Sequence, residues 1–192
     1  MPSPNQAAME FLLTRRSRPA RTLTTPVPTR DELMPILTAA ARVPDHGKLE
    51  PWRFIVLEKP ALTRLADLVA KRGAELGRSP EDNAKSVAQF ADADLVVAVI
   101  RCARSTDKIP DIEQTLSAGA VCLTVLNAAL ASGWGANWLT GWAVDDEVFC
   151  ETGLGLAFDE WIPGLIHIGT ETSAPPDRPR PDIDKITTWV SA

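Results

Sequence analysis

The 192-residue chain has only three cysteines and two histidines. This scarcity argues against a protein stabilised by disulfides and against one with a cysteine–histidine metal site. Cys102, Cys122 and Cys150 are scattered and odd in number, which indicates reduced thiols in a cytoplasm and no disulfide framework. His46 and His167 lie far apart, and no two cysteines or histidines have the spacing of metal ligands. We therefore expect a cytoplasmic protein without a metal site.

The chain also lacks long basic runs and any stretch typical of a secretory signal. Its formal net charge is −5, and adjacent basic residues occur only as pairs, so nucleic acid is not an expected partner. No N-terminal segment has the basic, then apolar, then small-residue order of a signal peptide. These absences leave a small molecule or another protein as the expected partner.

Size and composition indicate one globular domain over residues 1–192. Hydrophobic residues make up 45% of the chain and charged residues 23%, enough to build a sizeable core. No internal repeat, low-complexity tract or linker marks a second domain. The tail over about 173–192 is rich in proline and then becomes apolar again, so we expect it to dock on its own subunit or on a partner.

The hydrophobic periodicity and the turn residues predict a chain that alternates between helices and strands. Thr29 and Glu32 fit a capping box, although Pro35 falls inside the helix that they would begin. Helices are predicted over 6–14, 29–43, 60–76, about 80–90 and 112–132, with a short one from 145, and strands over 51–58, 94–102, 134–138 and 165–168.

From Ala118 to Ala131 the predicted helix 112–132 is apolar on nearly all sides, with Thr124 and Asn127 as the main interruptions. We expect it to be too short and too broken to span a membrane, so no membrane partner is predicted. A helix that is apolar all round must be buried all round. In so small a domain, a second subunit is expected to supply part of that cover.

The triplet Arg15-Arg16-Ser17 is the first candidate for chemistry. Its simpler interpretation is that the arginines complement the negative end of a helix dipole. Ser17 adds a hydroxyl donor, however, and Arg18-Pro19 forces the chain out of the helix. Guanidinium groups suit a phosphate or the edge of a pyrimidine-dione ring, because both present paired acceptors in a plane. The triplet therefore favours an anionic, planar ligand.

Three further segments are open to two interpretations on their residues alone. Arg42 and His46 flank Pro44 and could form no more than a surface turn. The glycine-rich segment 133–141 could be a tight turn, or could let backbone N–H groups approach a ligand. The arginine pair that ends at Arg180 could clamp a phosphate or be solvated.

Other polar residues are expected to have structural roles only. His167 falls on a predicted buried strand and is expected to be a satisfied core histidine. Asp111 and Glu113 open the long helix, where acidic side chains complement the dipole, and we assign them no catalysis.

The order Arg15-Arg16-Ser17, then Arg-x-Pro-Asp-His from Arg42 to His46, then Pro51-Trp52-Arg53-Phe54 resembles the FMN-dependent nitroreductase family. The likeness is greatest to its compact, YdjA-like members and runs from about residue 6 to about 181. It implies an α+β fold, with a three-layer α/β/α arrangement around a central mixed, mainly antiparallel sheet. It also implies a homodimer with the long buried helix at its interface and FMN bound there.

The resemblance assigns cofactor-binding roles by position. Arg15, Arg16 and Ser17 correspond to the residues that contact FMN phosphate, ribityl chain and ring edge. Arg42 and His46 correspond to residues that reach the flavin bound mainly to the other subunit. A third segment of the family contacts the flavin and corresponds to Trp138, Leu139 and Thr140, and Arg180 of the tail is the fourth candidate for binding the cofactor. Close relatives can carry Arg-Ser in place of Leu139-Thr140, so this chain keeps a hydroxyl and loses a charge there.

The implied activity is an FMN-dependent oxidoreductase. It would pass a hydride from NAD(P)H through flavin N5 to nitro compounds, quinones or similar small-molecule acceptors by a ping-pong mechanism. The chemistry would lie on the flavin, so no side chain is expected to be catalytic. The alternatives are another flavin reaction on the same scaffold and a non-catalytic FMN-binding protein.

Overall fold

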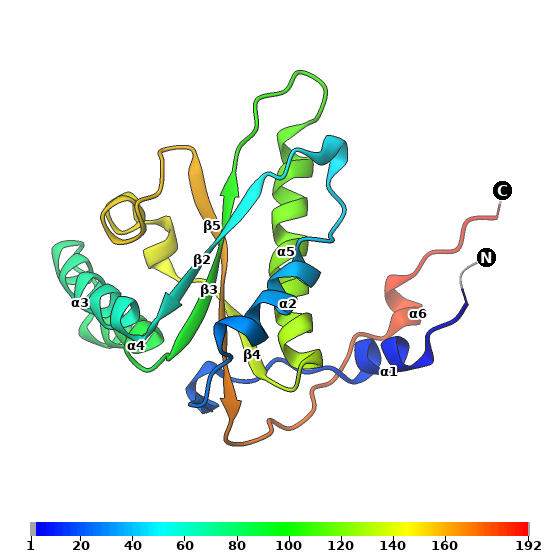
Figure 1. Ribbon diagram of the computed structural model, residues 1–192, viewed down its shortest axis with the longest axis horizontal. Coiled ribbons are helices and arrows are strands. Elements are labelled where there is room, and N and C mark those ends of the chain that lie inside the picture. Colours follow the sequence, from blue (N-terminus) through cyan, green and yellow to red (C-terminus); the bar gives the residue numbers. More distant parts are fainter. Residues whose placement is uncertain (1–2, 192) are drawn as a thin grey trace.

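The computed structural model describes residues 3–191, and Figure 1 shows a central sheet with helices on both faces. The strand order is β1-β5-β3-β2, and β4 pairs with β5 as well. The strands are β1 Leu23–Thr24, β2 Trp52–Glu58, β3 Leu95–Cys102, β4 Gly135–Leu139 and β5 Glu160–Glu171. The α+β class and the mainly antiparallel sheet are confirmed. Between residues 3 and 191 all pairings are antiparallel, so the parallel pairs of a mixed sheet do not occur there.

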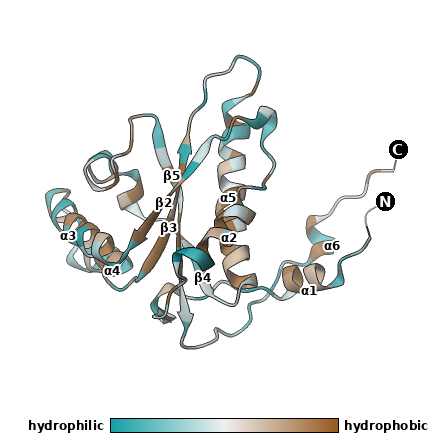
Figure 2. Cartoon of the chain, in the orientation of Figure 1, coloured by the Kyte–Doolittle hydropathy of each residue, from teal (hydrophilic) through white to brown (hydrophobic). Residues whose placement is uncertain are grey.

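The helices form the two outer layers of the expected α/β/α arrangement. Figure 1 shows α3 and α4 on one side of the sheet and α2 and α5 on the other, and each side has its own hydrophobic core. Figure 2 shows that the central strands β2 and β3 are largely hydrophobic. The helices are α1 Gln6–Thr14, α2 Arg30–Ala40, α3 Lys59–Glu75, α4 Pro80–Ala91, α5 Asp111–Ala131 and α6 Ile183–Ile186.

Local sequence signals account for where several elements begin. The Thr29 N–H donates to Glu32 Oε2 across 2.8 Å, and the Glu32 N–H donates to Thr29 Oγ1 across 3.4 Å, which completes the predicted capping box. Pro35 lies inside α2, and the helix ends at Ala40, before the expected Val43. Every residue of β3 is buried, as its continuous apolar run predicts for a strand covered on both faces.

Helix α5 packs on the sheet with one face and leaves another face open. Val121 and Val125 are fully buried, whereas 66% of Leu116 and 45% of Leu123 are exposed. By length and composition alone the whole of α5, Asp111–Ala131, could cross a membrane, although the stretch from Ala118 is shorter. Because 44% of its most apolar window is buried inside the protein, its apolar character matches a core helix. The expected burial on every side is not met within one chain.

The C-terminal tail runs away from the body of the protein, on the same side as α1 (Figure 1). Ile183, Ile186 and Trp189 have 64%, 68% and 90% of their surface exposed. The apolar end of the tail therefore does not dock on its own subunit, contrary to one of the two expectations. Docking on a partner subunit stays a prediction.

Candidate functional site

The arginine triplet lies where α1 ends and the chain turns toward the sheet. The Arg15 N–H donates to the Phe11 carbonyl across 2.7 Å and closes the last turn of α1. The Arg15 side chain then folds over the turn, because its Nη2 donates to Ser17 Oγ across 3.1 Å. Arg15 Nε is buried and has no hydrogen-bond partner in the protein. A buried, unpaired guanidinium nitrogen is costly, and a bound acceptor would satisfy it.

The tail contributes to the same cluster of positive charge. Nε and Nη2 of Arg16 donate to the Pro176 carbonyl across 3.3 and 3.2 Å, which holds the tail against the end of α1. Burial lowers the pKa of Arg15, and the nearby positive charges of Arg180, Arg16 and Arg18 lower it further. These arginines therefore repel one another and favour the binding of an anion between them.

A cavity of about 300 Å³ lies beside this cluster, between α1 and the end of α5. Arg15, Arg16 and Arg18 line it together with Gly133 and Glu171. Arg18 Nε pairs with Glu171 Oε2 across 3.3 Å, but Glu171 Oε1 is buried and has no partner. The cavity is thus lined by two residues that each carry a buried polar atom without a partner in the protein. Phosphate oxygens accept from guanidinium groups, so the arginine side of the cavity suits such a ligand.

The glycine-rich segment lies close to the triplet in space. The Arg18 N–H donates to the Ala136 carbonyl across 2.8 Å, which places the triplet beside β4. Trp138 Nε1 donates to the Pro163 carbonyl across 3.1 Å, so the indole is already paired within the protein. Leu139 ends β4, and Thr140 is exposed directly after it. Backbone groups and the Thr140 hydroxyl are therefore the parts of this segment that remain for a ligand.

Arg42 and His46 do not join this group within one chain. His46 Nδ1 lies 2.6 Å from Glu113 Oε2 in the first turn of α5, whereas Leu130, at the far end of α5, lines the arginine cavity. At about 1.5 Å per helical residue, Glu113 and Leu130 are roughly 25 Å apart. Arg42 follows α2 and lines an open groove on it. One chain therefore presents the expected site residues at two separate places.

His167 departs from its expected role. The ring is buried in β5, and burial lowers its pKa to about 4. Its Nε2 has no hydrogen-bond partner, so the expectation of a satisfied core histidine was wrong. It lines a cavity of about 240 Å³ with Gln89 and Leu139. No local pattern around His167 indicates an unpaired ring.

The cysteines have no arrangement that would activate a thiol. Burial raises the pKa of Cys102 to about 11, of Cys122 to about 12 and of Cys150 to about 11. Such thiols stay protonated near neutral pH and are poor nucleophiles. Within residues 3–191 no three His, Cys, Asp or Glu side chains come close enough to hold a metal ion.

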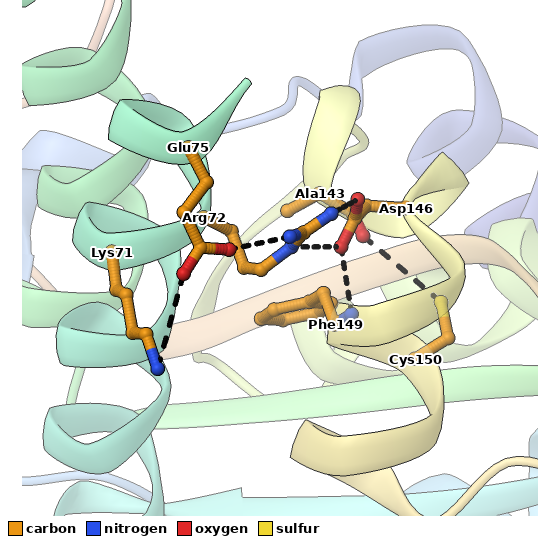
Figure 3. Close-up of polar contacts among 7 residues, drawn as sticks. All are labelled: Lys71, Arg72, Glu75, Ala143, Asp146, Phe149 and Cys150. Atoms are coloured by element: carbon orange, nitrogen blue, oxygen red, sulfur yellow. Dashed lines mark hydrogen bonds and ion pairs between the residues drawn. The ribbon is translucent and has the colours of Figure 1, made fainter. Parts of the chain in front are cut away.

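The charged cluster next to Cys150 is a structural tether (Figure 3). Arg72 of α3 donates from Nε and Nη2 to the Asp146 carboxylate across 3.1 and 2.8 Å. Asp146 Oδ1 also accepts from the Phe149 N–H across 2.8 Å, at the start of a π-helical turn. Hydrogen bonds from Arg72 lower the pKa of Asp146. Because these charges satisfy one another, the cluster fastens the segment before β5 to α3.

Comparison with known proteins agrees with this geometry. Residues 12–170 match the nitroreductase family. The chain is 34% identical over 165 residues to YdjA of Escherichia coli K12, which carries the name of an NAD(P)H nitroreductase, and the match covers 85% of this chain and 87% of YdjA. It is also 34% identical over 164 residues to a protein of the same naming from Haemophilus influenzae, covering 85% and 88% of the two chains.

Solved structures show the same fold. A nitroreductase-like protein from Bacillus cereus superposes with a TM-score of 0.79 at 23% identity, over 100% of both chains. A nitroreductase from Desulfovibrio desulfuricans, solved in complex with FMN, gives a TM-score of 0.73 at 19% identity over 99% of this chain and 100% of the other.

Proposed function

The chain belongs to the nitroreductase family and is an oxidoreductase, and from this premise we propose that it is an FMN-dependent NAD(P)H nitroreductase of the cytoplasm. FMN, when bound, accepts a hydride at N5 from NAD(P)H and passes reducing equivalents to a nitro compound, a quinone or a similar acceptor. Donor and acceptor use the site in turn, which is a ping-pong mechanism. The protein supplies binding, orientation and charge.

The observation that carries the proposal is the unpaired, buried Arg15 Nε in a cluster of arginines. Arg15 and Arg16 provide forked donors, and Ser17 adds a hydroxyl, for a phosphate and the ribityl chain next to it. Arg180 reaches the same cluster from the tail and adds charge to it. We assign the phosphate of FMN to this place.

The backbone of β4 lies next to the proposed phosphate site, which supports a flavin ring along Trp138, Leu139 and Thr140. Trp138 keeps its indole on Pro163, so its contribution is a fixed backbone. Reduction of a flavin builds negative charge at the pyrimidine end of the ring, and a nearby guanidinium stabilises that charge in a dry pocket. No side-chain acid or base is required for this step.

We also propose a homodimer with FMN at its interface. His46 contacts Glu113, which lies roughly 25 Å from Leu130 of the arginine cavity when measured along α5 at about 1.5 Å per residue. Arg42 lines a separate groove on α2. Arg42 and His46 would meet the same flavin only if a second copy brought them there. The exposed Leu116 and Leu123 on α5 supply an apolar surface for that contact.

The test is a visible absorbance spectrum of the purified protein, followed by anaerobic addition of NADPH or NADH. Flavin bands that bleach with one donor would support the proposal and identify the donor. A colourless protein that takes up no added FMN would overturn it. Flavin that stays oxidised with both donors would favour a non-catalytic FMN-binding protein.

A further inference from the structure

The contact between His46 and Glu113 fixes which ring nitrogen of the histidine carries a hydrogen. His46 Nδ1 lies 2.6 Å from Glu113 Oε2. An ionised carboxylate only accepts hydrogen bonds, so Nδ1 must be the donor. In the neutral ring the other nitrogen, Nε2, then keeps its lone pair and is an acceptor.

The loop that carries His46 is held in one conformation. The Asp45 carboxylate accepts from the N–H groups of Leu49 and Glu50 across 3.2 and 2.8 Å. Lys48 and Glu50 have φ values of 53° and 48°, in the left-handed region that residues with a side chain rarely adopt. Such a conformation persists only where its surroundings enforce it, and it occurs most often at functional sites.

The first turn of α5 is fixed as well. Asp111 pairs with the buried Arg101, which anchors the start of the helix to β3. Gln114 binds Arg104 twice: its Oε1 accepts from the Arg104 N–H across 2.8 Å, and its Nε2 donates to the Arg104 carbonyl across 3.0 Å. The residues on both sides of Glu113 are therefore anchored, which fixes the backbone of Glu113, while its side chain stays 42% exposed and contacts His46.

The same anchor reaches the His46 loop from the other side. The Arg104 guanidinium donates from Nε to the Leu49 carbonyl across 3.2 Å and from Nη2 to the Glu50 carbonyl across 3.3 Å. The start of α5 and the loop are thus both bound to one residue, Arg104, through its backbone and its side chain. This arrangement places the backbones of Glu113 and His46 beside each other.

We propose that Glu113 is a positioning residue that holds His46 in its Nδ1–H form, so that Nε2 accepts a hydrogen bond from a hydroxyl or N–H group of the bound ligand. This inference rests on the proposed function, in which His46 reaches the flavin of the partner subunit. The proposal gives the arginine triplet and the segment that carries His46 different roles. The arginines hold the phosphate, and His46 recognises a ribityl hydroxyl or a ring N–H.

Helix-dipole stabilisation by Glu113 would be the alternative role for the same carboxylate. Two substitutions separate the roles, because Glu113→Gln removes the charge but keeps an oxygen that accepts from Nδ1–H, whereas Glu113→Leu removes both. Glu81→Leu is the matched control, since Glu81 is also an acidic residue in the first turn of a helix, α4, away from His46.

The experiment is ¹⁵N NMR of the histidine rings in the purified protein, recorded as the pH is raised until the signals of the neutral rings no longer change. The chain has two histidines, so substitution of His46 itself assigns the signals. We expect the Nδ1–H form in the wild type, in Glu113→Gln and in the control, and its loss in Glu113→Leu. An Nε2–H ring in the wild type, or an unchanged ring in Glu113→Leu, would overturn the proposal.

Binding of FMN to the same variants tests the role of the ring. We expect Glu113→Leu to weaken FMN binding about tenfold, as for loss of one hydrogen bond, and Glu113→Gln to retain it. Equal weakening in both variants would overturn the proposal in favour of a charge effect. A wild type with the expected ring form that binds no FMN would overturn the proposed function and the ligand contact of His46 together. Loss of the ring form with unchanged FMN affinity would overturn the role of Glu113 alone.

Discussion

Arg18 donates its backbone N–H to the carbonyl oxygen of Ala136 across 2.8 Å, and this bond joins the chain after α1 to β4. Two motifs that are far apart in the sequence, the arginine triplet and the glycine-rich segment, become neighbours through it. The third motif, with His46, stays at the other end of α5. Under the proposed function, a complete site needs two copies of the chain, and the first prediction tests this.

We predict that Arg16→Ala and Arg42→Ala each weaken FMN binding about 10- to 100-fold, as expected for loss of a hydrogen bond to a charged group. Neither substitution removes a core side chain, so the fold should persist. Equilibrium titration with FMN measures the effect, and circular dichroism checks the fold. Arg30→Ala is the matched control, because Arg30 is an exposed arginine at the start of α2. Full flavin occupancy in both variants would contradict the site assignment.

Gly47→Ala should destabilise the loop that carries His46. Gly47 has a φ of 72°, and a Cβ placed there would lie 2.6 Å from Ile109 Cδ1. The left-handed backbone alone costs a residue with a side chain about 1–2 kcal/mol. We expect a lower thermal midpoint and weaker FMN binding. Gly77→Ala is the control, because Gly77 has a similar φ of 66° and nothing within 4 Å of its Cβ position. A smaller loss of stability in Gly47→Ala than in the control would refute the contact with Ile109.

Local signals in the sequence were enough to predict several helices and strands, but they did not predict the full length of β5. The capping box at Thr29 and the apolar run of β3 depend on neighbouring residues, and both were predicted. β5 begins at Glu160, well before the predicted start at 165. The prediction started too late because Pro163 and Gly164 interrupt the strand pattern in the sequence. The register between β3 and β5 shifts opposite this stretch, and such a bulge accommodates a proline that has no N–H to donate.

The candidate site was predictable as separate motifs but not as an arrangement. Arg15, Arg16 and Ser17 are adjacent in the chain, so their proximity needs no fold. Glu113 and His46 are 67 residues apart, and their contact depends on how α5 packs. From the sequence, an acidic residue at a helix start indicated only dipole stabilisation. Long-range pairs of side chains leave no local pattern, which is why this one was missed.

Glu160 should contribute stability that disappears in acid. Hydrogen bonds from Arg53, at 2.7 and 2.8 Å, hold the pKa of Glu160 at about 2, below its ordinary value of 4.5. A carboxyl whose folded-state pKa is depressed stabilises the fold above its unfolded pKa, and this stability is lost as the pH falls from about 4.5 toward 2. Glu160→Gln should therefore cost about 1–3 kcal/mol at neutral pH and much less near pH 2.

Denaturant unfolding of wild type and Glu160→Gln across that pH range measures this difference. Glu147→Gln serves as the control, because Glu147 is exposed and makes no ion pair that the structure records. A difference between wild type and Glu160→Gln that stays constant from neutral pH to pH 2 would show that the Arg53 pair does not depend on the Glu160 charge.

His167 is a basic group, but it should also make the fold less stable as the pH falls, as the acidic Glu160 does. Burial lowers the pKa of His167 to about 4, from an ordinary value of 6.5, so the folded protein disfavours the charged ring. Between these values the unfolded chain binds more protons, and stability falls as the pH falls from about 6.5 to about 4. The slope from one such group approaches about 1.4 kcal/mol per pH unit.

His167→Leu should remove this slope, because leucine does not titrate. It should also leave stability at neutral pH equal or higher, since the ring has a buried Nε2 without a partner. His167→Gln separates titration from burial: it should lose the slope as well, but be less stable than the wild type at neutral pH if its amide finds no partner. Denaturant unfolding between about pH 4 and 7 measures all three proteins. A slope that persists in both variants would mean that another group, and not His167, carries the acid sensitivity of the fold.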